Sequence, residues 1–294
     1  MTRESGPGLP IGPETAPGFQ GFRASMCAGR PRPVRECAGF GSAAESNAWF
    51  KQLVASGSTS LPLAFDLPSR MGHDSDSPIA SGNVGRAGVA IDSIDDMRVL
   101  FGGIPLAEVS TSLQIHAPGG APFLLLCQLV GEEQGVAAGR LAGTVQSDVL
   151  TEYVLTEYVR KEYVEQESYA FPPEPSMRLI ADVFRYCDAE MPKWGTPAAG
   201  LDADDFAPRL SFLFASRTTV TDLAIEVRQA ERLCKLRAVR DFPRVHDALV
   251  RLKRAAEGVD NVLYPMKEAL AAYATVGEVW DALREVWDTP SRAV

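Results

Sequence analysis

Thr144 and Gln146 have the residue types and the position expected of groups that bind a substrate. They lie in Gly143-Thr-Val-Gln-Ser-Asp148, at the carboxyl end of a predicted strand. Barrel enzymes place their substrate-binding groups at such strand ends. Two interpretations follow: Thr144 and Gln146 belong to a binding site, or they are two polar residues that close a strand.

Three histidines are the natural candidates for acid–base chemistry, because the imidazole group titrates near neutral pH. His116 ends a predicted strand and His246 lies on a predicted late helix, while His73 precedes the acidic sequence Asp74-Ser-Asp76. For each of them a structural or surface role is favoured over catalysis. We therefore assign no catalytic residue.

Two further patterns are better explained as turns than as ligand sites. Gly82-Asn-Val-Gly-Arg-Ala-Gly88 lacks the Gly-Lys-Ser/Thr sequence of a phosphate-binding loop and does not have the G-x-G-x-x-G spacing. Asp74-Ser-Asp76 offers two carboxylates for a cation, but no further ligands follow at a useful spacing. We predict no metal site.

The composition is that of an ordinary globular protein, with 46% hydrophobic and 23% charged residues in 294. A formal net charge of -9 argues against binding to nucleic acid or to an anionic membrane. The longest apolar run, Phe123–Val130, is too short to span a bilayer. The five cysteines are scattered without a CxxC pair, so a reducing cytoplasm is the expected location.

Helical and strand-like segments alternate through the first two thirds of the chain. The expected strands are Leu61–Phe65 and Val109–Ile115, and the expected helices are Glu45–Ala55, a helix that starts at Ser93-Ile-Asp-Asp96, and Ala121–Gly135. Repeated strand–helix units imply an α/β fold with a parallel sheet or a barrel. Periodicity alone does not separate these two.

The last quarter is predicted to be helical. Four segments have helical periodicity, and Thr275-Val-Gly-Glu278 is a capping box that opens the last of them. The four segments are Leu223–Arg240, Val245–Glu257, Met266–Tyr273 and Val276–Trp287.

A five-residue repeat interrupts the alternation. Leu150–Val154, Leu155–Val159 and Arg160–Val164 each end in Glu-Tyr-Val. Five residues turn a helix by about 140° beyond a full turn, so two extra units rotate the following residues away from their original face. An extended, partly solvated helix is favoured over a functional insertion.

The chain resembles the adenosylcobalamin-dependent acyl-CoA mutases, the methylmalonyl-CoA mutase family. The matching segments cover most of the sequence in family order; they include Gly29–Gly41, Ala64–Asp76, Gly143–Asp148, Tyr169–Arg178, Met191–Trp194, Phe206–Phe212 and Ala274–Val279. The resemblance implies a partial (β/α)8 TIM-type barrel with a helical C-terminal segment. We expect a leader at residues 1–20, a truncated acyl-CoA-binding barrel domain at 21–220 and a helical segment at 221–294.

The resemblance also implies binding roles for particular residues. Thr144 and Gln146 match positions that contact the thioester region, and the positions expected to hold CoA are Met26, Arg30, Arg35, Arg209 and Ser211. Arginine suits phosphate because its planar guanidinium makes paired charged hydrogen bonds.

A second pair of positions bears on the substrate. Methylmalonyl-type members hold the free carboxylate of the substrate with a Tyr and an Arg, and the corresponding positions here are Cys37 and Gln166. Gln at this position resembles the branch that acts on uncharged acyl groups such as isobutyryl-CoA. The alternative is that both positions have drifted without selection.

The catalytic features of the family are absent from the matching positions. The acid–base histidine should follow Met191-Pro-Lys-Trp194, but Gly195-Thr-Pro-Ala-Ala-Gly200 stands there, and no Asp-x-His-x-x-Gly cobalamin motif occurs. The resemblance therefore implies an isomerase subunit for an acyl-CoA substrate whose adenosylcobalamin is carried by a separate small subunit. The alternative is a non-catalytic remnant or gene-model fragment with at most weak binding to CoA or to a partner subunit.

Overall fold

The structure is a computed structural model that describes residues 41–116, 119–146, 171, 173–195 and 223–287. The leader, the Glu-Tyr-Val repeats and Gln166 lie outside these residues. The elements in chain order are α1 (Ala43–Ala55), β1 (Ser60–Ala64), α2 (Leu67–Met71), η2 (Pro78–Ala80), α3 (Ile94–Phe101), β2 (Ser110–His116), α4 (Gly120–Glu133), η3 (Ala138–Arg140), β3 (Ala142–Gln146), α6 (Pro173–Glu190), β4 (Trp194–Gly195), α8 (Leu223–Val239), α9 (Phe242–Glu257), α10 (Leu263–Ala271) and α11 (Val276–Trp287).

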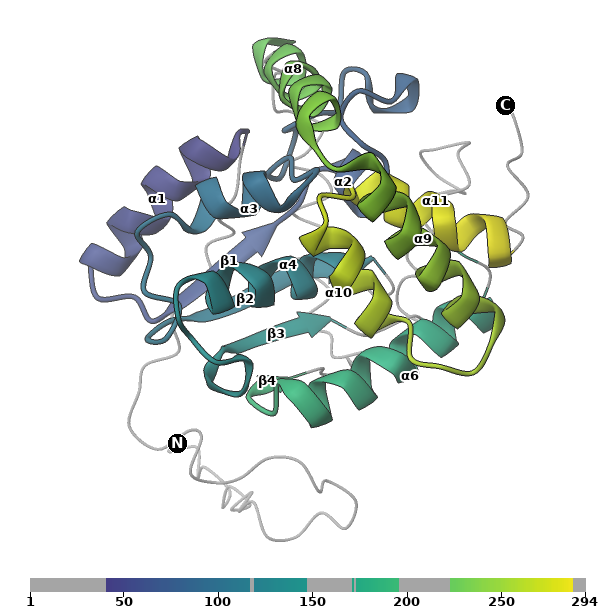
Figure 1. Ribbon diagram of the computed structural model, residues 1–294. Helices are drawn as coiled ribbons and strands as arrows, with labels where there is room; N and C mark the ends of the chain where they lie inside the picture. Colours follow the sequence, from purple (N-terminus) through teal and green to yellow (C-terminus); the bar gives the residue numbers. More distant parts are fainter. Residues whose placement is uncertain (1–40, 117–118, 147–170, 172, 196–222, 288–294) are drawn as a thin grey trace, which may run out of the picture. The chain divides into compact units, whose positions relative to one another are not determined.

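Four parallel strands form one sheet in the order β1-β2-β3-β4 (Figure 1). Neighbouring parallel strands need a crossover connection, and α3, α4 and α6 lie in the three connections. The predicted α/β fold with a parallel sheet is confirmed. In a (β/α)8 barrel, too, each strand lies next to the strand that follows it in the sequence. Closure of this sheet into a barrel stays a prediction.

One face of the sheet is apolar and packs against helices. Leu63 pairs in register with Leu113, and Leu113 with Val145; all three are at most 2% exposed. Helix α4 lies across this face (Figure 1). Gly120 at its start permits the close approach, since a Cβ there would lie 2.3 Å from Cγ2 of Val145.

The C-terminal helices share a hydrophobic core with the sheet. Val245, Met266 and Trp280 belong to the same buried cluster as Leu63 and Leu113. Two hydrogen bonds also join α6 to α9, because the Arg178 guanidinium donates to the carbonyl oxygens of Ala256 and Ala255 at 2.6 and 2.7 Å. The four predicted C-terminal helices are confirmed, whereas the expected division at residue 220 stays a prediction. None of the helices in the described ranges is long and apolar enough to cross a membrane.

Trp280 connects the last helix to the end of α2. Its side chain is 1% exposed and stacks on Phe171 with the ring centroids 4.6 Å apart. Gly72 ends α2 in the left-handed conformation (φ 69°), and a Cβ there would lie 2.4 Å from Cγ of Trp280. A side chain at position 72 would therefore be strained and would also clash with the indole ring.

We expect Gly72→Ala to destabilise the chain much more than Gly82→Ala. Both glycines have positive φ (69° and 75°), but nothing lies within 4 Å of a Cβ at Gly82. The backbone strain of about 1–2 kcal/mol is common to both variants, and overpacking against Trp280 adds about 1–3 kcal/mol at Gly72 alone. Urea unfolding measures the difference, and equal losses of stability would contradict the close packing.

Candidate functional site

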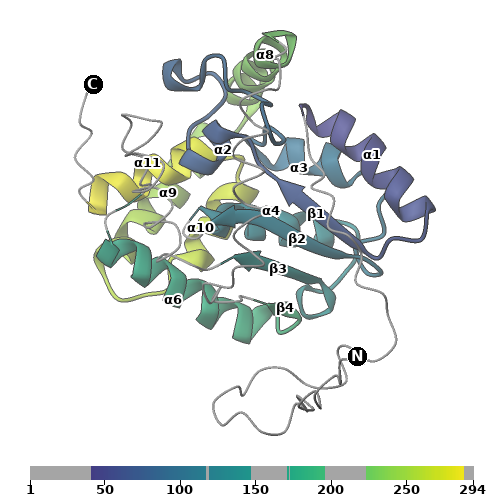
Figure 2. The ribbon, with the colours of Figure 1, turned by 180° about the vertical axis from the view of Figure 1, so that it is seen from behind.

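Small and polar side chains line the other face of the sheet. Ser112 and Gln114 in β2 alternate with the buried residues of that strand, and Ala142 and Thr144 do so in β3. Ser112 pairs in register with Thr144, and the Thr144 hydroxyl lies 3.0 Å from the Ser112 hydroxyl. Figure 2 shows the sheet from behind, with the strands in front of α4.

This face suits an elongated ligand that carries polar groups. Barrel interiors are normally filled by large branched side chains, whereas serine, alanine and threonine leave space. A hydroxyl can donate one hydrogen bond and accept others, so Ser112 and Thr144 can serve a carbonyl oxygen or an amide N–H. Both side chains are half-buried, which leaves them accessible to a ligand.

The structure places only part of the predicted site. Thr144 lies in β3 as predicted, and Gln146 is the last residue of that strand, where it pairs with His116 across a register shift. The two strand ends bearing Gln146 and His116 are thus adjacent. The remaining predicted site residues lie outside the described residues: Met26, Arg30, Arg35, Cys37, Gln166, Arg209 and Ser211.

Ser112 and Gln114 were missed by the sequence analysis. The signal that could have found them is the alternation in Ser110-Thr-Ser-Leu-Gln-Ile-His116, where a polar residue follows each apolar one. Such alternation shows that one face of the strand is polar. It does not show that this face meets Thr144 of the next strand.

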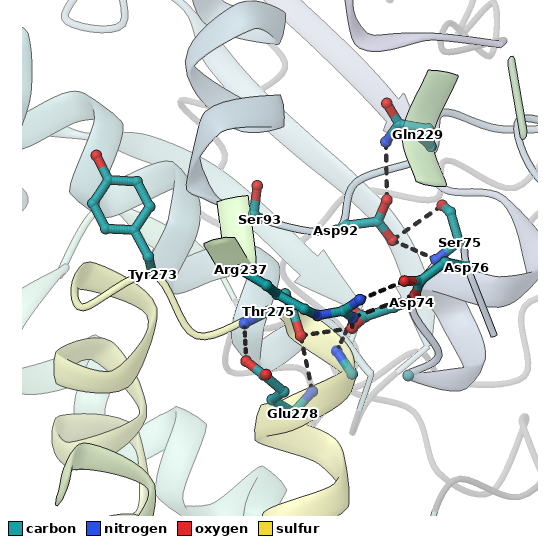
Figure 3. A network of polar contacts seen from close by, with 12 residues as sticks. Asp74, Ser75, Asp76, Asp92, Ser93, Gln229, Arg237, Tyr273, Thr275 and Glu278 are labelled. Atoms are coloured by element: carbon teal, nitrogen blue, oxygen red, sulfur yellow. Dashed lines mark hydrogen bonds and ion pairs between the residues drawn. The ribbon is translucent and has the colours of Figure 1, made fainter. Parts of the chain in front are cut away.

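A buried polar network holds the segment that follows α2 (Figure 3). Asp74 accepts hydrogen bonds from the hydroxyl of Thr275 at 2.6 Å, from the backbone N–H of Gly277 at 2.8 Å and from Arg237 at 2.7 Å. Arg237 also pairs with Asp76. The predicted turn is present, since the N–H of Ser77 donates to the carbonyl of Asp74 at 3.0 Å, but the sequence analysis missed the role of the carboxylates.

Two further carboxylates extend this network. Asp92 accepts from the backbone N–H and the hydroxyl of Ser75 at 2.8 and 3.0 Å, and from the Gln229 amide at 2.9 Å. Asp96 caps α3 by accepting from the N–H groups of Asp92 and Ser93, both at 3.0 Å, and it pairs with Arg232 at 2.9 Å. The network thus joins α3, α8 and α11 to the loop after α2.

Burial controls the protonation of these carboxyl groups. Loss of water around Asp74 raises its pKa to about 6, in spite of the hydrogen bond from Thr275. Burial raises the pKa of Asp92 well above its usual value, and the negative charges of Asp96 and Asp74 raise it further. Burial likewise raises the pKa of Asp66, the N-cap of α2, to about 6.

The histidines and the acidic groups do not form a metal site within the described ranges. His73 is half-buried, and that burial lowers its pKa. His246 lies on α9 and stacks on Phe242, with the ring centroids 6.4 Å apart. Neither histidine lies in the sheet.

A cavity of about 500 Å³ lies away from the sheet, on α9 and the start of α10. Arg251 in its lining is already paired with Glu268 at 3.0 Å. Thr144, which the sequence analysis selected, lies on the polar face of β2 and β3 and does not line this cavity.

Comparison with known proteins gives consistent matches. A family profile described as methylmalonyl-CoA mutase matches residues 9–198 and 217–289. The methylmalonyl-CoA mutases of Cereibacter sphaeroides and Rhizobium meliloti are both 39% identical to this chain, over 256 and 263 residues. These alignments cover 75% and 77% of this chain, but 34% and 35% of the relatives.

The methylmalonyl-CoA mutase large subunit of Propionibacterium freudenreichii is 40% identical over 231 residues, which cover 67% of this chain and 30% of that protein. The chain spans about a third of the length of the curated relatives it matches.

We expect Thr275→Val to destabilise the chain by about 2–3 kcal/mol, because Thr275 is fully buried and its hydroxyl serves two partners. Valine keeps the shape but removes one of the three donors to Asp74 and leaves the N–H of Glu278 without its side-chain acceptor. Thr275→Ser is the matched control: it keeps the hydroxyl, loses one methyl group, and should lose about 1 kcal/mol. Chemical unfolding checks both variants; an equal or larger loss for serine would contradict the assigned role of the hydroxyl.

Proposed function

The chain belongs to the methylmalonyl-CoA mutase family, and on that premise we propose that it binds an acyl-CoA along the polar face of β2 and β3. The observation that carries the proposal is the pair of hydroxyls of Ser112 and Thr144, 3.0 Å apart on a face with small neighbours. A thioester with an amide-containing chain needs both hydrogen-bond donors and acceptors, and hydroxyl groups supply both.

The two ends of the ligand would be held by different residues. Thr144 and Gln146 are proposed to lie near the thioester, at the carboxyl ends of the strands where parallel sheets bind ligands. Arginines fit the phosphates of CoA because they make paired charged hydrogen bonds. The proposed CoA-binding residues are Met26, Arg30, Arg35, Arg209 and Ser211.

We further propose that the acyl group is short, branched and uncharged, as in isobutyryl-CoA. Cys37 and Gln166 stand at the positions where methylmalonyl-type members use a Tyr and an Arg. A carboxylate buried without a cationic partner is unfavourable by several kcal/mol. Neither cysteine nor glutamine supplies a positive charge.

The reaction proposed for the assembled enzyme is a carbon-skeleton isomerisation that uses adenosylcobalamin from a separate small subunit. The residues of this chain do not fit a resident cobalamin: the sequence has no Asp-x-His-x-x-Gly motif, and the described residues form no cluster suited to a metal.

A second candidate function is a non-catalytic remnant with weak affinity for CoA or for a partner subunit. Two observations favour it. The chain spans about a third of its relatives, and the residues after Trp194 and Gly195 of β4 contain no histidine before His246. A base or acid at the reacting group must be within hydrogen-bond reach to transfer a proton.

We expect no detectable isomerisation of isobutyryl-CoA by this chain alone, even with adenosylcobalamin added. The matched control is the full-length mutase of Rhizobium meliloti, assayed with methylmalonyl-CoA. Product formation is followed by chromatography. Turnover by the chain that disappears when adenosylcobalamin is left out would contradict this prediction.

We expect isobutyryl-CoA to bind more tightly than methylmalonyl-CoA, because Cys37 and Gln166 carry no positive charge to hold the free carboxylate of methylmalonyl-CoA. Such a contact contributes about 1.5–3 kcal/mol, or roughly ten- to a hundredfold in affinity. Thr144→Val should weaken the binding of both thioesters by roughly two- to tenfold, because it removes one neutral hydrogen bond. Isothermal calorimetry measures these affinities.

The outcomes distinguish the two candidate functions. Tighter binding of methylmalonyl-CoA would mean that another cation holds its carboxylate, which contradicts the proposed acyl specificity. Failure of the folded chain to bind either thioester would favour the remnant.

A further inference from the structure

Three buried carboxylates face one helix. Asp74, Asp92 and Asp96 are 7%, 1% and 3% exposed, and α8 supplies a partner to each of them. Arg237 pairs with Asp74 at 2.7 Å, Arg232 pairs with Asp96 at 2.9 Å, and the neutral Gln229 donates to Asp92 at 2.9 Å. Figure 3 shows Asp92 between Ser75 and Gln229.

The charges around this cluster do not balance. Besides the three carboxylates, Asp76 and Glu278 contribute negative charge next to Asp74. The positive charges come from α8 and the residue that follows it: Arg232, Arg237 and Arg240, the last paired with Glu278 at 2.5 Å. Within the described residues the hydrogen-bond donors to Asp92 are neutral: the N–H and hydroxyl of Ser75 and the amide of Gln229.

We propose that Asp92 retains a proton at neutral pH, and that this proton makes the docking of α8 a pH-sensitive latch. An ionised Asp92 would add a negative charge beside Asp74 and Asp96 in a buried site. When α8 undocks, Gln229 moves away from Asp92 and water can solvate the Asp92 carboxylate. The ionised group therefore favours the undocked helix, and the protonated group favours the docked one.

The direction of the pH effect follows from this linkage. Burial and the neighbouring Asp96 and Asp74 hold the pKa of Asp92 well above its ordinary value of 3.8 in the docked state. Docking is strongest below that ordinary value. It weakens as the pH rises toward the pKa of the docked state, by up to about tenfold in the equilibrium constant per pH unit, and then levels off.

Asp74 and Asp96 differ from Asp92, because burial raises their pKa values but the α8 arginines that pair with them lower those pKa values against the effect of burial. Their removal has a different consequence, since each of them pairs with an arginine of α8. Asp92→Asn removes a titrating group without removing the partner of a cation. Asp74→Asn makes the same chemical change but leaves Arg237 with only Asp76.

The test is hydrogen exchange of the full chain by NMR at pH 5, 6, 7 and 8, with each rate divided by its intrinsic rate. The readout is the opening constant of amides in α8, such as Leu233 and Leu236, relative to Leu125 and Leu126 in α4. Between pH 5 and pH 7 the opening constant of the α8 amides should rise in wild type by a factor at least ten times larger than in Asp92→Asn. Asp74→Asn should open α8 more than wild type at pH 7 and 8, where Asp74 is ionised and pairs with Arg237.

Two results would overturn the proposal. One is an equal pH dependence of α8 opening in wild type and Asp92→Asn. The other comes from the wild-type chain alone and does not depend on a variant that folds: the carboxyl ¹³C resonance of Asp92 should keep its protonated chemical shift at pH 7, and its complete ionisation by pH 5 would show that no proton is retained.

Discussion

A carboxylate can be buried only where hydrogen-bond donors surround it, and this requirement ties the N-terminal half of the chain to its C-terminal helices. Asp74 follows the first strand and the short helix α2, yet its donors are Thr275, Gly277 and Arg237. Removing one donor leaves the buried carboxylate short of a hydrogen bond, which is unfavourable by roughly 1–3 kcal/mol. The position of α11 and the course of the loop after α2 are therefore set by the same contacts.

The two faces of the sheet differ: one packs against helices, and the other is proposed to bind the ligand. Its apolar face, with Leu63, Leu113 and Val145, is covered by helices and supplies the buried area on which stability depends. Its other face carries Ser112 and Thr144, which contribute little apolar burial and are available to a ligand. A parallel sheet normally needs large apolar residues on both faces, so polar residues on one face indicate a function other than packing.

Local signals predicted the elements of this fold, because capping and periodicity depend on neighbouring residues. The capping boxes at Ser93–Asp96 and Thr275–Glu278 are both present. The contact between Asp74 and Thr275 spans 201 positions in the sequence, and no periodicity encodes such a pairing. The same limit applies to Ser112: its alternation in β2 is local, but its approach to Thr144 depends on the register between two strands.

Binding of acyl-CoA to the polar face of β2 and β3 can be tested directly. Backbone NMR spectra recorded during a titration with isobutyryl-CoA locate the binding surface residue by residue. Binding at the proposed face predicts that the largest shifts occur at Ser112–Gln114 and Ala142–Thr144. Shifts confined to the α9–α10 cavity around Arg251 and Tyr264, or no shifts in the folded chain, would contradict it.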